Sequence, residues 1–428
     1  MCVTFKSSIL LDLQQRNLIA DSTDSVALDD LLAAKSVTFY CGFDPTAPAL
    51  HLGNLAQIIT MMRFQQYGHR PLVLIGGATG LIGDPKESGE RSLNTQDVVD
   101  GWLNRIKESV TKYFDFSSTN ACIVVNNYEW TKDFSAISFL RDIGKHFSIN
   151  RMLDRDAVSV RLANQGISYT EFSYVLLQSL DYVELHKTYE CQLQIGGSDQ
   201  WGNITSGCDL VRRMNGATVH ALTTPLIVKA DGTKFGKTES GTVWIDKELT
   251  SPYAFYQFWL NADDRDVETY LNTFSFKSHD EIRELVQQSQ AEPHLRIGQR
   301  ALAEELTTLV HSTEATTKVI QASDALFGSS ELERVDIETL LNAVQEAGLV
   351  EISATEFDAC QTIVEAMVVS GISPSKGAAR RTIAEGGAYL NNERVTDPEM
   401  AISRSNLIQN QLLVLRRGKK TIGGIRLV

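Results

Sequence analysis

The chain has 428 residues, of which 43% are hydrophobic and 22% are charged, and its formal net charge is −13. This length exceeds what one hydrophobic core usually supports, so we expect two or three domains. The composition argues against a disordered or fibrous protein, and six cysteines without a CxxC pair argue against a zinc ribbon or a disulfide framework. The apolar runs are too short for a signal peptide or a membrane span, so we expect a cytoplasmic protein without a membrane partner.

Short predicted strands and helices alternate along the first half of the chain. Residues 37–41 are mostly β-branched or aromatic and precede a turn, and residues 71–75 form an apolar run closed by two glycines, so both predict strands. Apolar residues recur at helical spacing from Leu52 until Gly68, which predicts a helix. Further strands are predicted at 121–125, 191–195 and 225–228. This alternation predicts an α/β fold with a doubly wound, Rossmann-like parallel sheet and a ligand at the carboxyl ends of its strands.

The first candidate site combines a strand end, a turn and a helix start. It covers residues 40–46 and then the HLGN motif at residues 51–54. A helix N-terminus offers unpaired N–H groups and a positive dipole to an anion, so phosphate fits there. His51 and Thr46 can donate hydrogen bonds to phosphate oxygens, while Gly53 lets an adenine ring approach the helix. A surface turn with an incidental histidine explains the same residues, so this motif alone leaves both interpretations open.

Residues 169–181 predict a helix with a polar face. Tyr174, Gln178 and Asp181 occur at i, i+4 and i+7, so their side chains share one side of the helix. A phenol, an amide and a carboxylate that converge there can bind a zwitterion that carries its own hydroxyl group. An exposed polar stripe is the alternative interpretation.

Two glycine-rich loops follow along the chain. Residues 196–203, at a strand-to-helix turn, can contact a ribose and an amino acid. Residues 229–238, the KFGKT loop, carry three lysines, whose ammonium groups can neutralise charge on a leaving pyrophosphate. This loop does not match the Walker pattern GxxxxGK[ST], which disfavours a P-loop ATPase, and a solvated basic hairpin is the alternative.

The C-terminal segment has the opposite charge to the rest of the chain. Residues 372–428 contain ten lysines and arginines against four acidic residues. Apolar residues recur throughout this segment, which favours a folded module over a solvated tail. A small basic module on an acidic body suggests a partner that carries phosphates.

These segments together resemble one family. The sequences HLGN and KFGKT are similar to the HIGH and KMSKS signatures of class I aminoacyl-tRNA synthetases. The segments YCGFDPTA, GGATGLIGDP, TEFSY and LQIGGSDQWGNITSG narrow the resemblance to bacterial tyrosyl-tRNA synthetases, from about Leu10 to the C-terminus. The segment SPSKGAARRTIAEGGAYLNNERV resembles the S4-type RNA-binding domain that ends bacterial members of that family.

The resemblance implies roles for residues at matching positions. Tyr40 and Asp181 would contact the phenol of a tyrosine substrate, and its ammonium group would meet Asp84, Tyr174 and Gln178. The residues implied in binding ATP or the adenylate are Cys41, Gly42, Asp44, Gly53, Gly197, Asp199 and Gln200. The residues implied in catalysis are His51, Asn54, Thr46, Lys234, Lys237 and Thr238.

The same resemblance implies the reaction and the partners. L-Tyrosine and ATP would form tyrosyl adenylate and pyrophosphate, and the tyrosyl group would then pass to the 3′-terminal ribose of tRNA(Tyr). Mg²⁺ would be bound with ATP and pyrophosphate, no metal would be held tightly by the protein, and the chain would form a homodimer. The residues expected to bind tRNA are Lys376, Arg380, Arg381, Arg416, Arg417, Lys419 and Lys420.

The chain departs from the family pattern at three places. Asn54 stands where the signature has a second histidine, but an amide N–H can donate from nearly the same position. The mobile loop reads KFGKT in place of KMSKS and keeps both lysines. The segment from Asp84 to Arg91 is one residue shorter than the pattern, which leaves the roles of Lys86 and Arg91 in contacting pyrophosphate or tRNA open.

The expected domain order follows from the motifs and the resemblance. A catalytic domain at 1–248 precedes a helical domain at 249–328, an irregular connector at 329–365 and a small α+β S4-like RNA-binding domain at 366–428. Ser278 and Glu281 have the spacing of a capping box at a helix start within the helical domain.

Two alternative functions follow from the same residues. A non-catalytic RNA-binding protein descended from a synthetase would keep the basic module without ATP chemistry. The loss of His51, Lys234, Lys237 or Asp181 would favour it, but all four are present. A synthetase for tryptophan or another aromatic amino acid is the nearer alternative, although the pair of Tyr40 and Asp181 suits a phenol better than an indole.

Overall fold

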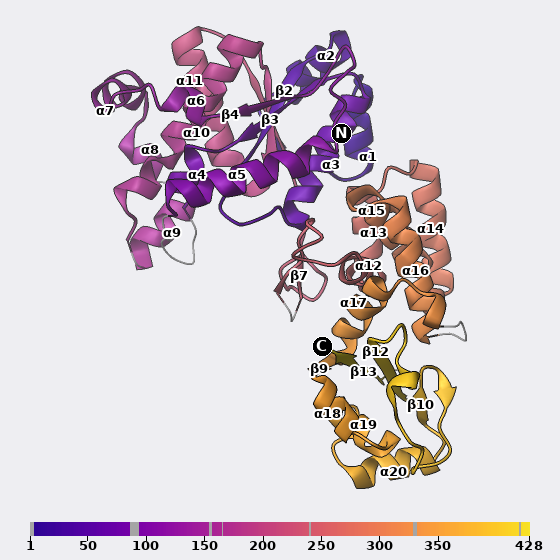
Figure 1. Ribbon diagram of the computed structural model, residues 1–428. Helices are drawn as coiled ribbons and strands as arrows, with labels where there is room; N and C mark the ends of the chain where they lie inside the picture. Colours follow the sequence, from indigo (N-terminus) through magenta and orange to yellow (C-terminus); the bar gives the residue numbers. More distant parts are fainter. Residues whose placement is uncertain are drawn as a thin grey trace. The chain divides into compact units, whose positions relative to one another are not determined.

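The chain forms two compact units (Figure 1). The computed structural model describes residues 4–85, 94–153, 156–164, 166–238, 241–327, 332–418 and 421–428. The first unit is Met1–Asp246 with Arg265–Gln287, and the second is Lys247–Asp264 with Gln288–Val428. The segment predicted as a helical domain, 249–328, is therefore shared between the two units. Lys86 and Arg91 lie outside the described residues.

A six-stranded sheet forms the centre of the first unit, with strand order β1-β6-β5-β2-β3-β4. The short edge strand β1 is antiparallel to β6, and the other strands are parallel. The strands are β1 (Asp21–Ser22), β2 (Thr38–Phe43), β3 (Arg70–Ile75), β4 (Ile123–Asn126), β5 (Leu193–Gly197) and β6 (His220–Thr224). The chain proceeds outward from β2 to β4 and then returns to β5 beside β2, so the topological switch lies between β2 and β5.

Helices connect these strands. The longer ones are α1 (Ser8–Gln15), α2 (Ser25–Ala34), α3 (Leu52–Gln66), α5 (Gln96–Thr111), α9 (Asp156–Asn164), α10 (Tyr169–Tyr189), α11 (Trp201–Asn215) and α13 (Val267–Phe274). Short helical turns are α4 (Thr79–Ile82), α6 (Tyr128–Thr131), α7 (Ala136–Ser138) and α8 (Ile149–Leu153). The predicted helix after the HLGN motif is confirmed as α3, and the predicted polar-faced helix is confirmed as part of α10.

Neighbouring residues of β2 show that helices cover both faces of the sheet. Phe39 and Tyr40 point to opposite faces because side chains alternate along a strand. The ring of Phe39 contacts Phe64 of α3, with centroids 4.8 Å apart, whereas the ring of Tyr40 contacts Tyr182 of α10 at 5.1 Å. All four side chains are buried. The predicted doubly wound, Rossmann-like fold is confirmed.

One predicted strand is wrong. We expected a strand at 225–228, but β6 occupies His220–Thr224 and ends directly before Pro225. Proline has no N–H to give to a sheet ladder, so the strand cannot continue through it in the interior of a sheet. Val228 instead pairs with Lys234 of the KFGKT loop in an isolated bridge.

The second unit combines helices with a small α+β module. Its helices are α12 (Pro252–Leu260), α15 (Ile297–Val310), α16 (Thr313–Phe327), α17 (Ile337–Gly348), α18 (Ala354–Ala359), α19 (Ile363–Val369) and α20 (Lys376–Ala384). Helix α14 (His279–Ala291) runs through the boundary between the units. Its predicted capping box is confirmed, because the N–H of Ser278 donates to the Glu281 carboxylate (2.8 Å) and the N–H of Glu281 donates to Ser278 Oγ (3.3 Å).

A five-stranded sheet, β11-β10-β12-β13-β9, organises the C-terminal module. The strands are β9 (Leu349–Ile352), β10 (Ala388–Leu390), β11 (Glu393–Arg394), β12 (Leu412–Arg417) and β13 (Thr421–Leu427). Leu413 and Leu415 of β12 are buried in one core with Ile383 of α20 and Leu390 of β10. The segment expected as an irregular connector, 329–365, contains α17, β9 and α18, and β9 joins this sheet parallel to β13.

The structure offers one observation on membranes. In the described part of the chain, no helix is both long enough and apolar enough to cross a bilayer. A cytoplasmic location stays a prediction from the sequence.

Candidate active site

The HLGN motif and the KFGKT loop lie next to each other in the first unit. The N–H of Leu52 donates to the carbonyl of Val243 (3.3 Å), and His51 pairs with Trp244 in an antiparallel bridge. Gly236 of the KFGKT loop packs closely on the start of α3, because a Cβ added to it would lie 3.3 Å from Leu52 Cβ. The fold thus brings together two motifs that are far apart in the sequence.

His51 and Asn54 cap the start of α3 reciprocally. His51 Nδ1 accepts a hydrogen bond from the N–H of Gly53 (3.1 Å), while Asn54 Oδ1 accepts one from the N–H of His51 (3.1 Å). Since the Asn54 oxygen is engaged, the nitrogen of this carboxamide is the atom that can donate to a ligand. The helix start therefore presents its donors where an anion is favoured.

The protonation of His51 suits hydrogen bonding to phosphate. The protein around the ring displaces water and lowers the pKa of His51, and the nearby Lys237 ammonium lowers this pKa further. This desolvation acts although part of the side chain is open to solvent. A neutral ring with Nδ1 as the acceptor carries its proton on Nε2, which can donate to a ligand oxygen.

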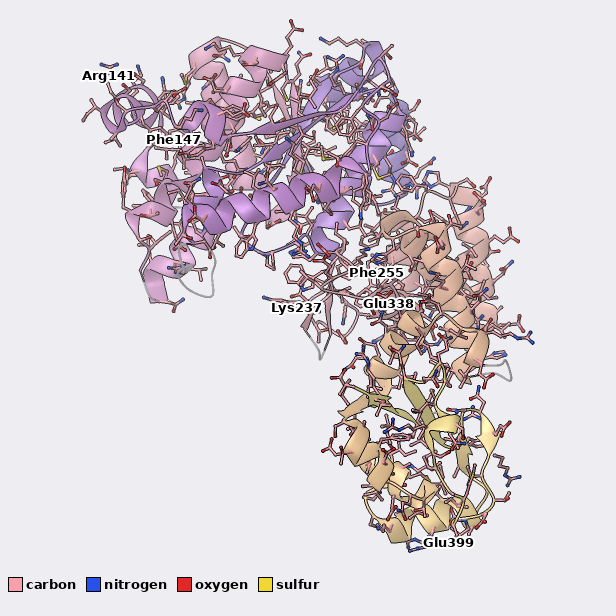
Figure 2. The ribbon with its side chains drawn as sticks, in the orientation of Figure 1. Arg141, Phe147, Lys237, Phe255, Glu338 and Glu399 are labelled. Atoms are coloured by element: carbon pink, nitrogen blue, oxygen red, sulfur yellow. The ribbon has the colours of Figure 1, made fainter. Side chains whose placement is uncertain are left out.

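The KFGKT loop is anchored by its aromatic residue. The centroid of the Phe235 ring lies 5.2 Å from that of Tyr270 and 5.5 Å from that of Phe274, both on α13. Lys234 and Lys237 on either side of this anchor are exposed, and Figure 2 shows Lys237 at the surface of the loop. An anchored centre with exposed ammonium groups can hold positive charge against a polyphosphate.

A buried carboxylate lies close to Tyr40. Asp181 of α10 is 1% exposed and Tyr40 of β2 is fully buried. Asn127 Nδ2 donates to one oxygen of Asp181 (3.0 Å), and Trp130 Nε1 donates to the other (2.9 Å). Asn127 is itself held, because its Oδ1 accepts from the N–H of Ala78 (2.7 Å). The carboxylate therefore has a fixed position and still has lone pairs for a further donor.

The pKa values of this pair follow from their burial. Burial raises the pKa of Asp181 from 3.8 to about 8, although the hydrogen bonds from Asn127 and Trp130 oppose this rise. Burial also raises the pKa of Tyr40, and the charge of Asp181 adds to the effect. Tyr40 therefore stays protonated, whereas Asp181 changes protonation near neutral pH. A ligand hydroxyl that donates to Asp181 would favour its ionised form.

A second carboxylate holds Tyr174. The Tyr174 hydroxyl donates to Asp44 Oδ2 (2.7 Å), and Thr79 Oγ1 donates to Asp44 Oδ1 (2.6 Å). Gly76 supplies the space for this group, because a Cβ added there would lie 1.9 Å from Asp44 Oδ1. Asp44, expected among the ATP or adenylate contacts, thus meets Tyr174, which was expected at the ammonium group.

Asp84 meets the loop that follows β5. Gln200 Nε2 donates to Asp84 Oδ2 (3.1 Å) and to Asp199 Oδ2 (3.1 Å). Asn203 Nδ2 donates to the other oxygen of Asp84 (3.0 Å) and to Gln200 Oε1 (3.0 Å). The structure therefore brings a residue expected at the tyrosine ammonium group together with two residues expected at the adenylate.

Three buried polar atoms suit a ligand. Tyr40 Oη and Gln178 Oε1 have no hydrogen-bond partner among the described residues, and neither does Gln194 Oε1 on the strand next to Tyr40. An unpaired buried polar group costs about 1–3 kcal/mol. A ligand with its own hydroxyl and ammonium groups would satisfy such atoms.

The other predicted residues of this site lie at strand ends and turns. Gly42 is exposed in β2, Gly197 is the last residue of β5, and Thr46 is half-buried in the turn after β2. The backbone of Thr238 belongs to β7 (Lys237–Thr238), which pairs with β8 (Gly241–Thr242), and its side chain lies outside the description.

The remaining reactive groups among the described residues are the cysteine thiols and possible metal-binding clusters. Burial raises the pKa of Cys41 to about 12, so this thiol stays protonated. The cysteines that the structure describes are all unbridged. Within the described ranges, no three His, Cys, Asp or Glu side chains are arranged to hold a metal ion.

The sequence analysis missed the residues that hold Asp181. Asn127 directly follows the carboxyl end of β4, where α/β proteins commonly place ligand-binding groups, so its position was a usable signal. Trp130 carried no such signal, because a tryptophan in a short helix is ordinarily interpreted as a core residue. Gln194 was missed because it lies inside a predicted strand.

The cations expected to bind tRNA have different surroundings in the second unit. Lys376 forms an ion pair with Glu365 (2.9 Å), and Arg380 forms one with Glu399 (3.3 Å). Glu399 lies beside α20 in Figure 2. These acidic neighbours reduce the positive charge that α20 presents to a phosphate.

Arg416 of β12 has an aromatic neighbour. The guanidinium of Arg416 lies over the ring of Tyr389, 4.3 Å from its centroid. Arg417 and Arg381 are exposed. Lys419 and Lys420 lie outside the described residues.

Comparisons with known proteins agree with the geometry. Residues 32–328 match the family described as tRNA synthetases class I (W and Y), and residues 344–422 match the tyrosine–tRNA ligase SYY-like C-terminal domain. A tyrosine–tRNA ligase of Kineococcus radiotolerans is 54% identical over 414 residues, which cover 97% of either chain. A tyrosine–tRNA ligase of Streptomyces avermitilis is 55% identical over 421 residues, 98% of this chain and 99% of the relative.

Solved structures agree as well. A C-terminally truncated mitochondrial tyrosyl-tRNA synthetase of Aspergillus nidulans superimposes with a TM-score of 0.68 at 30% sequence identity. The match covers 75% of this chain and 94% of that chain.

The raised pKa of Asp181 predicts a pH-dependent stability. The carboxyl group titrates near 3.8 in the unfolded chain and at about 8 in the folded chain. Between these values the folded protein binds the additional proton, so the free energy of unfolding falls as the pH rises. The slope from this group approaches about 1.4 kcal/mol per pH unit. Urea unfolding from about pH 5 to about pH 7 should show that the difference in free energy of unfolding between the wild type and Asp181→Asn changes with this slope, whereas parallel pH profiles would contradict this prediction.

Proposed function

We infer that this chain, which belongs to the tyrosine–tRNA ligases of the class I aminoacyl-tRNA synthetase family, activates L-tyrosine with ATP and transfers it to tRNA(Tyr). The observation that supports tyrosine as the substrate is the buried pair of Tyr40 and Asp181. This pair lies in the same unit as the adjoining HLGN motif and KFGKT loop. The roles of individual residues below are parts of this proposal.

The phenol of the substrate is proposed to lie between Tyr40 and Asp181. Its oxygen would accept the hydrogen of Tyr40, whose Oη has no partner among the described residues, and its own hydrogen would go to the Asp181 carboxylate. The ammonium group would donate to oxygen atoms of Tyr174, Gln178 and Asp84. The hydroxyl of Tyr174 can accept there because its hydrogen is already given to Asp44 (2.7 Å).

This arrangement discriminates among aromatic amino acids. Phenylalanine would leave the hydroxyl of Tyr40 unpaired and would not give Asp181 the additional donor that a phenol supplies, and tyrosine–tRNA ligases are themselves the standard example of this kind of rejection. Tryptophan would offer an indole N–H to Asp181, but it has no acceptor for the hydrogen of Tyr40. The pocket therefore favours a phenol over both competitors.

The triphosphate is proposed to bind between the start of α3 and the KFGKT loop. His51, Asn54 and Thr46 would donate to phosphate oxygens, and the adenine would lie against Gly53. Lys234 and Lys237 would neutralise the charge that builds on the departing pyrophosphate. Mg²⁺ belongs to the substrate in this scheme, because it is bound with ATP and pyrophosphate.

The first chemical step is an in-line displacement at the α-phosphorus. An oxygen of the tyrosine carboxylate forms a bond to this phosphorus, and the bond from the phosphorus to the pyrophosphate oxygen breaks. The products are tyrosyl adenylate and pyrophosphate. The protein supplies no nucleophile, so its contribution is to position the two substrates and to stabilise the charge of the transition state.

The second step transfers the tyrosyl group to tRNA. A hydroxyl of the 3′-terminal ribose attacks the carbonyl carbon of the adenylate, and AMP leaves. The basic C-terminal module is proposed to bind the RNA backbone. Arg416 and Arg417 of β12 suit this role better than Lys376 and Arg380, because the latter two form ion pairs with acidic residues.

We propose that the chain acts as a homodimer. Ile137 is 72% exposed, Ile149 is 64% exposed and Leu162 is 46% exposed, and they belong to α7, α8 and α9 in turn. These helices lie at the same side of the first unit in Figure 1. Large apolar side chains exposed together on one side of a domain commonly mark a protein–protein interface.

Exchange of labelled pyrophosphate into ATP tests the proposed function. We expect exchange that depends on tyrosine and is far slower with tryptophan or phenylalanine at equal concentration. Faster exchange with tryptophan than with tyrosine would instead indicate a tryptophan-binding pocket. RNA binding with no amino-acid-dependent exchange would support the non-catalytic alternative.

Removing either loop lysine should affect activation more than tyrosine binding. Lys234→Ala and Lys237→Ala should each slow single-turnover formation of tyrosyl adenylate by about 100-fold or more, because one transition-state contact is lost. The dissociation constant of tyrosine should stay within about twofold, since the phenol and ammonium contacts lie elsewhere. Lys107→Ala on α5 removes an exposed charge outside the loop and serves as the control. Wild-type rates in both loop variants would reject their assignment.

Adding one carbon at Gly76 should weaken tyrosine binding. In Gly76→Ala the new Cβ would lie 1.9 Å from Asp44 Oδ1, so Asp44, which accepts the hydrogen bond of Tyr174, must shift. A forced shift of this kind costs about 1–3 kcal/mol, which corresponds to roughly 5- to 150-fold in the dissociation constant measured by equilibrium dialysis. Gly101→Ala on α5 meets no atom within 4 Å and should bind tyrosine normally. Unchanged binding by Gly76→Ala would contradict the proposed ammonium site.

A further inference from the structure

The KFGKT loop is attached to α13 at two points. Its Phe235 packs against rings of α13, as described above, and the N–H of Ala230 donates to Asp266 Oδ1 (2.9 Å) directly before this helix begins. The Tyr270 hydroxyl also donates a hydrogen bond to Asp266 Oδ2 (3.4 Å). A displacement of α13 would therefore move the start and the centre of the loop together.

Two buried arginines hold the other end of α13. Arg63 Nη1 donates to the carbonyl of Thr273 (2.9 Å), and its Nη2 donates to the carbonyl of Ser275 (2.8 Å). Arg16 Nη1 donates to the same Ser275 carbonyl (3.1 Å). The last carbonyls of a helix have no partner within the helix, and a cation there also meets the negative end of the helix dipole. The arginines thus fix the carboxyl end of α13.

Arg63 connects this support to the first signature. It lies in the last turn of α3, the helix that His51 caps at its other end. The rise from His51 to Arg63 is about 18 Å for a regular helix. One rigid helix therefore carries the HLGN motif at its start and holds the support of the KFGKT loop near its end.

Arg161 provides a contrast within the same unit. It is also 2% exposed, but it donates to the carbonyl of Gly166 (3.2 Å) and pairs with Glu171 of α10 (3.1 Å). These partners belong neither to α13 nor to the KFGKT loop. Arg161 can therefore be essential for folding without determining the position of the KFGKT loop.

We propose that Arg63 is a positioning residue for the ATP step. By holding the carboxyl end of α13, it fixes the KFGKT loop at the spacing from the HLGN motif that the triphosphate requires. Arg63 acts through α13 and Phe235 and touches neither substrate. The inference rests on the proposed role of the loop lysines in adenylate formation.

The test compares Arg63→Lys with Arg161→Lys in the full-length protein. Lysine keeps the charge but cannot donate to two carbonyls in the planar geometry of a guanidinium. Arg63→Lys should slow single-turnover formation of tyrosyl adenylate by about 10- to 100-fold, because a small misplacement of reacting groups has an effect of this size. Its dissociation constant for tyrosine should stay within about twofold of the wild type. Arg161→Lys should leave the rate per active site unchanged at saturating tyrosine.

A double-mutant cycle separates positioning from general loss of stability. Phe274→Leu weakens the contact between α13 and Phe235 directly. If Arg63 acts through that contact, the double variant should lose less activity than the product of the two single losses, because neighbouring effects on one element are not additive. Arg16→Lys replaces Arg63→Lys in this cycle if the latter does not fold, since Arg16 holds the same Ser275 carbonyl.

The outcomes are distinct. An active wild type with an unchanged rate in Arg63→Lys, or an equal slowing in Arg161→Lys, would overturn the inference and leave the proposed function intact. Strictly multiplicative losses in the cycle would also overturn it. A wild type without tyrosine-dependent exchange would instead reject the proposed function.

Discussion

The backbone pairing between residues 50–52 and 243–245 is the contact on which the site depends. The N–H of Ile245 donates to the carbonyl of Leu50 (3.0 Å), and the N–H of Leu52 donates to that of Val243 (3.3 Å). Backbone hydrogen bonds tolerate little displacement, so this pairing holds the KFGKT loop beside the start of α3. Burial lowers the pKa of His51, and the Lys237 ammonium, which this pairing keeps nearby, lowers that pKa further. The proposed phosphate donors and the loop lysines are thereby held at one site.

The tyrosine side of the site depends on a different constraint, which is the burial of Asp181. A carboxylate in this position is unfavourable for stability, and its pKa of about 8 expresses that penalty. Asn127 and Trp130 offset part of it and hold the oxygens in place, which leaves the group able to recognise a hydroxyl. Tyr40 lies on β2, beside the topological switch between β2 and β5, and is therefore close to Asp181. The proposed selectivity for a phenol would therefore be obtained at some cost in stability.

Much of this arrangement could be predicted from the sequence, for reasons that differ between elements. The apolar strands and the helical spacing after Leu52 are local signals, and they predicted most of the parallel sheet and α3 correctly. The spacing of Tyr174, Gln178 and Asp181 on α10 is also local. Asn127, Trp130 and the contact of Arg63 with α13 are not, because they depend on which segments the fold brings together. The prediction of a strand at 225–228 was wrong because Pro225 has no N–H to donate to the sheet, although the residues after it include apolar ones.

The most direct test of this account is a crystal structure of the protein with a non-hydrolysable analogue of tyrosyl adenylate. The phenol oxygen of the analogue should lie within hydrogen-bond distance of Tyr40 Oη and an oxygen of Asp181. The phosphate mimic should lie at the start of α3 and face the KFGKT loop. A phenol bound away from Tyr40 and Asp181, or a phosphate mimic without contacts to residues 51–54, would contradict the proposed site.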